Sequence, residues 1–193
     1  MEAFERLPGI GPRQARRFVY ALLDESQKFR SELAELIENL NKEVSRCRNC
    51  FRIFPRKSEF CDICENSSRD DSQLLVVEKD ADLENLEKNK IYQGKYFVLG
   101  GTLSPLKPEK KEKLKLKELQ SKIENSRAIS EVILAFAATT EGDMTRRFIE
   151  EILENVAQKR PLKITNLGRG LSTGTELEYS DRETLKHAFE NRK

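Results

Sequence analysis

The sequence has little of what would place it in several common classes of protein. Its 193 residues carry 35 basic and 33 acidic side chains, so the net charge is only +2 and no overall basic field attracts nucleic acid. Any DNA binding must therefore come from locally clustered positive charge. No apolar run approaches the ~18 to 20 residues that a membrane span needs, and we expect no membrane segment.

Signatures of catalysis and of export are also scarce. The single histidine, His187, lies in a stretch that predicts a terminal helix, where we expect a surface or packing role. The segment GRGLSTG contains no Gly-Lys-Ser/Thr, so the sequence has no phosphate-binding P-loop there. The start of the chain, MEAFERLPGIG, lacks the apolar region of a secretory signal. We therefore expect a cytoplasmic protein, associated with the nucleoid if it binds DNA.

Four cysteines, in the segment CRNCFRIFPRKSEFCDIC, form the most specific motif. They are arranged as two Cys-x-x-Cys knuckles, Cys47 with Cys50 and Cys61 with Cys64. Each knuckle lets two thiolates converge on one ion, and two knuckles complete a closed tetrahedral zinc site with no open position for catalysis. The spacing predicts one structural Zn²⁺ per chain. Two disulfides are an alternative that needs an oxidising compartment, and iron is a minor competitor for the site.

Basic and aromatic residues alternate between the two knuckles. Arg52, Arg56 and Lys57 are interspersed with Phe51 and Phe54, a pattern that could contact phosphates and bases. The simpler interpretation, which we favour, is a solvated ribbon whose aromatic side chains pack around a metal in place of a larger core.

The segment LPGIGPRQARRFVYALL predicts a helix-hairpin-helix near the N-terminus. Gly9 and Gly11 fit a tight turn, and Pro12 fits the first position of the following helix. The glycines permit close approach of a phosphate, and the amides of the helix N-terminus point at the anion. Three arginines share one face of this helix and predict a DNA contact without base readout, namely Arg13, Arg16 and Arg17. The alternative is an ordinary Pro-Gly turn beside a solvated basic face.

The remaining sequence predicts further helices and a small parallel sheet. Residues 27–44 have the spacing of an amphipathic helix that contributes to a core or an interface. Buried strands are expected at residues 74–77, 96–99, 131–137 and 163–166, and helices at 144–157 and 182–191, with a short acidic helix after the first strand. The Lys- and Glu-rich run 105–120 predicts an exposed excursion.

Four features in this order resemble the bacterial RecR family of recombination mediators. They are the LPGIG hairpin, the four-cysteine ribbon followed by Arg69-Asp70, LLVVE with YQGKYFVLGGTLSPL, and GRGLSTGTELEYSDRETL. The hairpin and the cysteine spacing are each widespread, but the ordered set is specific and spans nearly the whole chain.

The resemblance implies a multidomain α+β protein. Residues 1–45 would form a helix-hairpin-helix region that binds DNA and residues 46–70 a four-cysteine zinc finger. Residues 71–166 would form an α/β Toprim domain with a parallel sheet, the module also found in topoisomerases and primases. Residues 167–193 would form a C-terminal strand and helix segment for oligomerisation, and family members assemble as dimers or tetramers.

Catalytic Toprim domains use a glutamate after the first strand and an Asp-x-Asp pair, followed by Glu and Gly, at a later strand end. Glu78 and Glu141-Gly142 match this pattern, but the aspartate positions hold Ala137 and Thr139. Magnesium requires a fixed set of hard oxygen ligands, which alanine cannot supply. We therefore predict no enzymatic activity.

The acidic residues at this strand end have two compatible interpretations. The resemblance implies a surface for a partner protein, RecO in particular, formed by Glu78, Glu141 and Asp143. Alternatively, Thr139 or Thr140 caps the following helix and the acidic residues stabilise its positive end.

The function that the resemblance implies is loading of RecA, with RecO and possibly RecF, onto single-stranded DNA coated by binding protein. DNA binding would not be sequence-specific and could involve single or double strands. One alternative is a Mg²⁺-dependent nuclease or primase using Glu78, Glu141 and Asp143. Another is a zinc-ribbon DNA-binding accessory without a mediator role.

Overall fold

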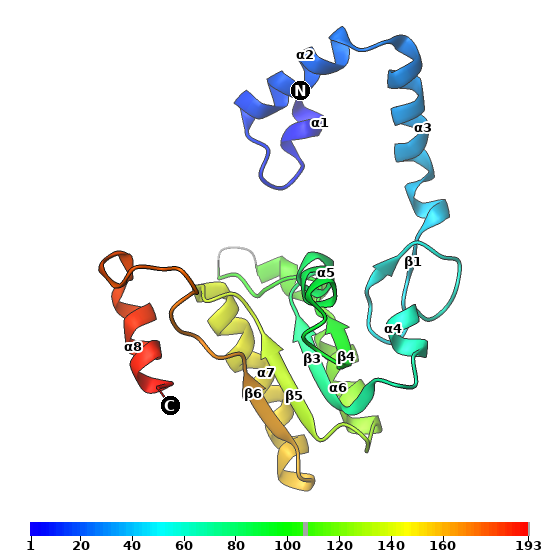
Figure 1. The fold of residues 1–193 in the computed structure, drawn as a ribbon. Helices are drawn as coiled ribbons and strands as arrows, with labels where there is room; N and C mark the ends of the chain where they lie inside the picture. Colours follow the sequence, from blue (N-terminus) through cyan, green and yellow to red (C-terminus); the bar gives the residue numbers. More distant parts are fainter. Residues whose placement is uncertain (106–107, 193) are drawn as a thin grey trace. The chain divides into compact units, whose positions relative to one another are not determined.

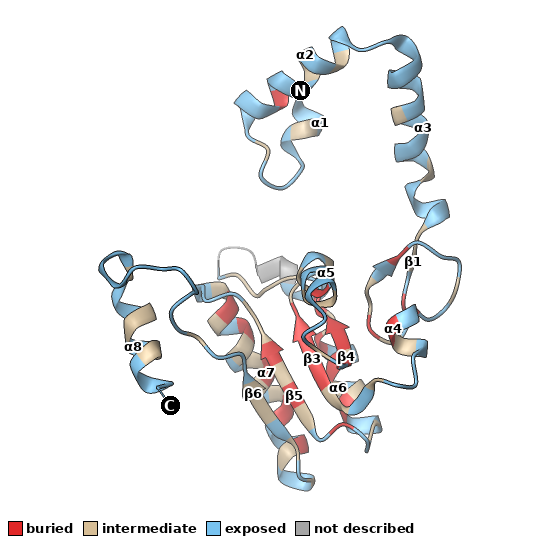
Figure 2. Ribbon diagram, in the orientation of Figure 1, coloured by how far each residue is buried: buried red, intermediate tan, exposed pale blue. Residues whose placement is uncertain are grey.

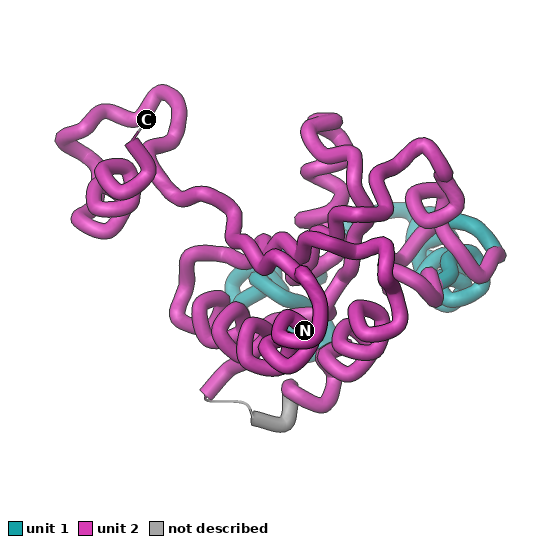
Figure 3. The backbone as a smooth tube through the Cα atoms, turned by 90° about the horizontal axis from the view of Figure 1, so that it is seen from below, with its two compact units in different colours: residues 1–45, 55–57 teal, residues 46–54, 58–193 magenta. Residues whose placement is uncertain are grey.

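The computed structural model describes residues 1–105 and 108–192. Leu106 and Lys107, which belong to the Lys-rich run, and Lys193 lie outside the described residues. The chain divides into two compact units, shown in Figure 3, one of residues 1–45 and 55–57 and the other of residues 46–54 and 58–193. The first unit is helical, and the second contains the four cysteines and the parallel sheet.

Three helices form the first unit, α1 (Glu2–Glu5), α2 (Pro12–Asp24) and α3 (Gln27–Glu43) (Figure 1). Pro12 occupies the first position of α2, where its missing N–H leaves no helical hydrogen bond unmade. Ser26 caps α3 by accepting a hydrogen bond from the Phe29 amide at 3.1 Å. The helices predicted from Pro12 onward and over residues 27–44 are therefore confirmed.

The helices of the first unit bury little of their apolar surface. Within residues 1–45, Ala15 is the one fully buried residue, and most of α2 and α3 is exposed (Figure 2). Leu36, Ile37 and Leu40 lie on one face of α3, and each is more than half exposed. The helix α3 is amphipathic as predicted, but its apolar face does not pack against a core inside the unit.

After α3 the chain forms a short two-stranded sheet, β1 (Ser45–Arg46) with β2 (Ile53–Phe54), and then the short helix α4 (Asp62–Glu65). The four-stranded parallel sheet comes next. Its strands are β3 (Asp70–Val77), β4 (Gly94–Val98), β5 (Glu131–Ala135) and β6 (Lys163–Asn166), in the order β4-β3-β5-β6. The predicted parallel sheet is confirmed.

The two faces of the parallel sheet pack against different partners. Leu74 and Val76 of β3 belong to the cluster that contains the apolar residues of α6 (Leu116–Asn125) and α7 (Thr140–Lys159). Leu75 and Val77 point to the opposite face because successive strand residues alternate, and there they join the cluster that includes three of the four cysteines. The cysteine ribbon lies at the β4 edge of the sheet, where its cysteines join this second cluster and its Phe51 packs against the first.

The remaining elements connect or flank the sheet. They are the acidic helix α5 (Asp80–Asn89), the 3₁₀ turns η1 (Pro108–Lys113) and η2 (Leu177–Tyr179), and the C-terminal helix α8 (Arg182–Glu190). No helix among the described residues is long and apolar enough to cross a membrane.

Three local predictions were wrong. Residues 114–120 are not part of an exposed excursion, because Leu114, Leu116 and Leu119 are buried and begin the apolar face of α6. β5 ends at Ala135, two residues before the predicted end, and α7 begins at Thr140, four residues before its predicted start. The earlier start follows from the cap at Thr139, whose side chain accepts a hydrogen bond from the Gly142 amide at 3.1 Å.

Candidate metal centre and nucleic-acid interface

The four cysteine sulfurs converge on one point. The Sγ atoms of Cys47, Cys50, Cys61 and Cys64 all lie within 4.8 Å of one another, and all four residues are free cysteines. Tetrahedral zinc with Zn–S distances near 2.3 Å would set its sulfurs about 3.8 Å apart. The donor set and its spacing therefore fit zinc, and the four residues that would hold it are those predicted.

Local backbone hydrogen bonds shape both knuckles. In the first, the Phe51 amide donates to the Cys47 carbonyl at 2.9 Å, and Phe51 has a positive φ of 63°. In the second, the Cys64 amide donates to the Cys61 carbonyl at 3.0 Å. The Val98 amide of β4 donates to the Cys50 carbonyl at 2.8 Å, which ties the first knuckle to the sheet.

The four thiols influence one another's ionisation. Hydrogen bonds from Cys50 and Cys64 hold the pKa of the Cys61 thiol well below its ordinary value. The same interaction with Cys61 raises the pKa of Cys50. A divalent cation bound at the centre would displace the protons of the cluster and hold four thiolates.

The aromatic residues of the ribbon are part of the core. Phe54 is 3% exposed, and Phe51 packs against Phe97 with ring centroids 5.2 Å apart. Arg52 forms an ion pair with Asp62 at 3.2 Å. These contacts agree with the favoured interpretation, in which the aromatics pack beside the metal ligands.

The hairpin before α2 has the backbone that its glycines predict. Gly9 has a φ of +79°, in the left-handed region that favours glycine. Gly11 has an ordinary φ of −90° and is the N-cap of α2, where its carbonyl accepts from the Ala15 amide at 2.9 Å. A Cβ added at either glycine would meet no atom within 4 Å, so the space beside this turn is open to a ligand.

Three exposed arginines follow the hairpin on α2, namely Arg13, Arg16 and Arg17. Their spacing of i, i+3 and i+4 places them on one side of the helix. Within the part of the chain that the structure describes, none of them forms an ion pair with a carboxylate. Their charge is therefore available to an external anion, and their role in DNA binding stays a prediction.

At the carboxyl ends of β3 and β5, the structure brings together two of the three predicted acidic residues. Glu78 follows β3, Glu141 lies in the first turn of α7, and both line a cavity of about 580 Å³. Ala137 and Thr139 line the same cavity, at the positions where the resemblance to catalytic Toprim domains implies aspartates. This edge of the sheet therefore offers a metal ion few carboxylate ligands.

Gly142 is required by the backbone at this edge. A Cβ built on it would lie 2.1 Å from the carbonyl oxygen of Ala137. The Glu-Gly pair of the sequence motif therefore has a steric reason that is independent of any metal. The capping interpretation of the strand end is supported, with Thr139 as the N-cap and two acidic residues in the first turn.

Asp143 faces different partners from Glu78 and Glu141. It forms ion pairs with Arg169, at hydrogen-bond distance, and with Arg146 at 3.8 Å. The Arg169 guanidinium holds the pKa of the Asp143 carboxyl below its ordinary value. Asp143 thus joins α7 to the segment before α8, and a partner surface formed by all three acidic residues stays a prediction.

Sequence reasoning missed a second group of polar residues at the cysteine ribbon. Lys122 of α6 donates a hydrogen bond to Oδ1 of Asn49 in the first knuckle. Lys95 of β4 donates to the carbonyls of Cys64 and Asn66 in and after the second knuckle, at 3.2 and 2.8 Å. No sequence motif indicated these contacts, which join residues 29 to 73 positions apart.

The single histidine, His187, is half-buried, as expected for a packing or surface role.

Comparisons with known families and proteins cover almost the whole chain. The profile described as "RecR, helix-hairpin-helix" matches residues 1–40, "Toprim domain" matches residues 72–167, and "RecR, C-terminal" matches residues 170–193. Recombination protein RecR of Dehalococcoides mccartyi is 36% identical over 192 residues, which cover 100% of this chain and 91% of the relative. Recombination protein RecR of Francisella tularensis subsp. novicida is 37% identical over 192 residues, 100% of this chain and 92% of the relative.

The fold and the cysteine cluster thus define a multidomain protein with a helix-hairpin-helix, a ribbon whose four cysteines could bind a metal ion, and a Toprim domain. The likeness to the two relatives extends over the entire chain. The chain belongs to the RecR family of recombination proteins, which implies a role in DNA recombination and repair.

Proposed function

We propose that the chain is a non-catalytic recombination mediator. In this proposal it binds DNA and, with RecO and with RecF where present, loads RecA onto single-stranded DNA coated by binding protein. The observation that carries the non-catalytic part is the end of β5, where Ala137 and Thr139 replace the aspartate pair of Toprim enzymes. Asp143 offers no substitute ligand, since Arg169 and Arg146 neutralise it.

The proposed cofactor is one structural Zn²⁺ per chain, held by the four cysteines. Its support is the closed, mostly buried thiolate set, which leaves no ligand position for a substrate. The ion would supply the central cross-link of a ribbon whose strands β1 and β2 have two residues each. Zinc would therefore stabilise the ribbon and take no part in a reaction.

The proposed DNA contact consists of the hairpin and the arginines beside it. The open space at Gly9 and Gly11 permits approach of a phosphate to the backbone. Phosphate contacts of this kind fix position without reading sequence, so single or double strands of any sequence could bind. A protein that acts on DNA in this way would be found in the cytoplasm with the nucleoid.

The proposed protein surfaces lie at two places. Glu78 and Glu141 form an acidic pair at the sheet edge that suits a basic surface of RecO, with Asp143 on the adjoining side of α7. The exposed apolar face of α3 suits contact with other copies of the chain in a dimer or a tetramer.

The sheet-edge surface can be tested by binding measurements with RecO. The variant Glu78→Gln/Glu141→Gln should weaken the affinity of the full chain for RecO several-fold, because two interface charges are lost. The matched control is Glu151→Gln/Glu154→Gln, which removes two exposed charges farther along α7. Equal affinities for the two variants would move the RecO surface elsewhere.

Catalysis can be tested on the same preparations. The chain with Mg²⁺ should neither cut, relax nor prime DNA above the level of a blank. An activity that Glu78→Gln abolished would establish the nuclease or primase alternative in place of the mediator.

A further inference from the structure

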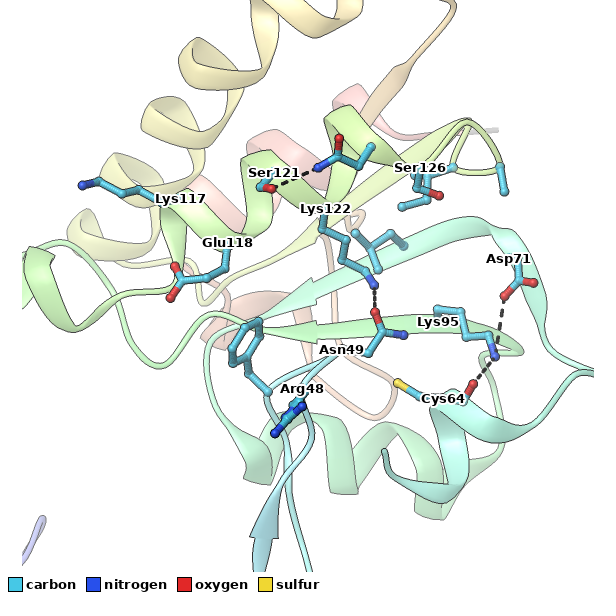
Figure 4. Close-up of a pocket in the computed structure, with 15 residues that line it drawn as sticks. Arg48, Asn49, Cys64, Asp71, Lys95, Lys117, Glu118, Ser121, Lys122 and Ser126 are labelled. Atoms are coloured by element: carbon cyan, nitrogen blue, oxygen red, sulfur yellow. Dashed lines mark hydrogen bonds and ion pairs between the residues drawn. The ribbon is translucent and has the colours of Figure 1, made fainter. Parts of the chain in front are cut away.

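A cavity of about 830 Å³ lies within the second unit, between the first knuckle and α6 (Figure 4). Asn49 and Cys64 of the ribbon and Lys122 of α6 are among its lining residues. Cys64 is the partly exposed member of the cysteine cluster, whereas the other three cysteines have no exposed surface. The cluster is therefore closed on its other sides and meets solvent and α6 through this cavity.

Lys122 directs its charge toward the cysteines. Its Nζ donates a hydrogen bond to Oδ1 of Asn49, which lies between Cys47 and Cys50 in the chain (Figure 4). Across residues 1–105 and 108–192, the ion pairs to carboxylates do not include Lys122. Burial lowers the pKa of Lys122, and negative charge on the nearby Cys64, Cys50 and Cys47 acts in the opposite direction.

An unpaired, half-buried ammonium is unfavourable unless a nearby negative charge compensates it. The zinc-bound cluster would provide that charge, because four thiolates around one divalent ion leave an excess of two negative charges. The excess must itself be offset, since the cluster is largely removed from water. The ammonium of Lys122 and the zinc–thiolate cluster would therefore each neutralise part of the other's charge.

Lys95, the other lysine at the ribbon, has a different environment. Its Nζ donates to the carbonyls of Ile63, Cys64 and Asn66 and also forms an ion pair with Asp71 at 3.6 Å. Part of its charge is thus neutralised, and its contacts are those of a lysine that holds the second knuckle in place. Lys122 is the lysine whose charge remains for the cluster.

We propose that Lys122, held in place by Asn49, is the cation that offsets the charge of the zinc–thiolate centre and raises the affinity of the centre for Zn²⁺. The inference rests on the proposal that the cluster holds zinc. It also connects the metal to the Toprim domain, because Lys122 belongs to α6, whose residues Leu119 and Ile123 are buried in the core beneath the sheet.

The test is a competition titration of the full chain with a chromogenic zinc chelator. Lys122→Met keeps the length of the side chain and removes its charge, and Lys122→Arg keeps the charge. The matched control is Lys117→Met, on the same helix and lining the same cavity, with its amine directed away from the cysteines (Figure 4). Circular dichroism checks the fold, and the Co²⁺ charge-transfer spectrum reports whether four thiolates still bind.

We expect Lys122→Met to weaken zinc binding roughly 10-fold, as measured for other groups that support metal ligands. Lys117→Met should bind as the wild type does, Lys122→Arg should recover most of the affinity, and the Co²⁺ spectrum should stay that of a four-thiolate site. If the wild type binds zinc and the two methionine variants have equal zinc affinities, the role of Lys122 is overturned but the proposed cofactor is not. A wild type that binds no zinc would overturn the proposed cofactor as well.

A second variant covers the case in which Lys122→Met does not fold. Asn49→Ala removes the acceptor that holds the amine but keeps the charge on α6. A loss of zinc affinity in this variant supports placement of the cation by Asn49, and an unchanged affinity contradicts it.

Discussion

Replacing the arginines of α2 provides a quantitative test of the DNA interface. The variant Arg13→Ala/Arg16→Ala/Arg17→Ala should bind DNA more weakly and with a smaller dependence on salt. The three side chains are exposed and form no ion pair with a carboxylate in residues 1–105 and 108–192, so each can neutralise one phosphate. We expect the fold and the cysteine centre to be unaffected, since no buried side chain changes.

The expected size follows from counterion release. The slope of log K against log salt is about −0.9 for each phosphate neutralised on duplex DNA, so three contacts contribute about −2.7. Between about 50 and about 200 mM salt, this part of the slope corresponds to a loss of roughly 40-fold in the affinity of the wild type. The affinity of the triple variant should therefore fall less steeply with salt, by this factor.

The assay is fluorescence anisotropy with a labelled duplex and a labelled single strand over this range of salt. The matched control is Lys111→Ala/Lys113→Ala/Lys117→Ala, which also removes three exposed positive charges, from the second unit. Its salt slope should equal that of the wild type. A smaller slope for the lysine variant, with an unchanged slope for the arginine variant, would refute our placement of the interface on α2.

Three further predictions concern the metal and the Toprim edge. Cys61→Ser should reduce the zinc content from about one per chain to near zero and lower the melting temperature, measured by metal analysis and calorimetry on reduced protein. Gly142→Ala should lower the free energy of unfolding by about 3 kcal/mol in urea titrations, because its Cβ meets the Ala137 carbonyl, whereas Gly168→Ala, with open space around it, should cost far less. Asp143 has a depressed pKa, so its contribution to stability is present above its ordinary pKa of 3.8 and is lost as the pH falls through the lower folded value. Asp143→Asn should therefore be less stable than the wild type at neutral pH, with a difference that shrinks on acidification; a constant difference would contradict this reasoning.

Local patterns made the cysteine centre and the hairpin predictable. The spacing within each Cys-x-x-Cys knuckle determines which sulfurs can meet, and Gly9 with Pro12 specifies a turn and a helix start from adjacent residues alone. Strands such as β3 were recognisable because they are continuous apolar runs.

Contacts between distant residues could not be predicted in the same way. The high density of charge in residues 105–120 concealed the spacing of Leu116, Leu119 and Ile123, which defines the buried face of α6. The pairing of Asp143 with Arg169 and that of Lys122 with Asn49 depend on how α7 and α6 pack, over separations of 26 and 73 residues. The charge of these side chains is visible in the sequence, but the partner is decided by the tertiary structure.

The central claim is that this chain helps RecA to replace the binding protein on single-stranded DNA. The most direct measurement is DNA-dependent ATP hydrolysis by RecA on strands coated with single-stranded-DNA-binding protein, with RecO and this chain added separately and together. We expect the lag before hydrolysis to shorten only when both are present, and we expect the arginine variant of α2 to leave the lag unchanged. A wild-type chain that does not shorten the lag in the presence of RecO would contradict the account.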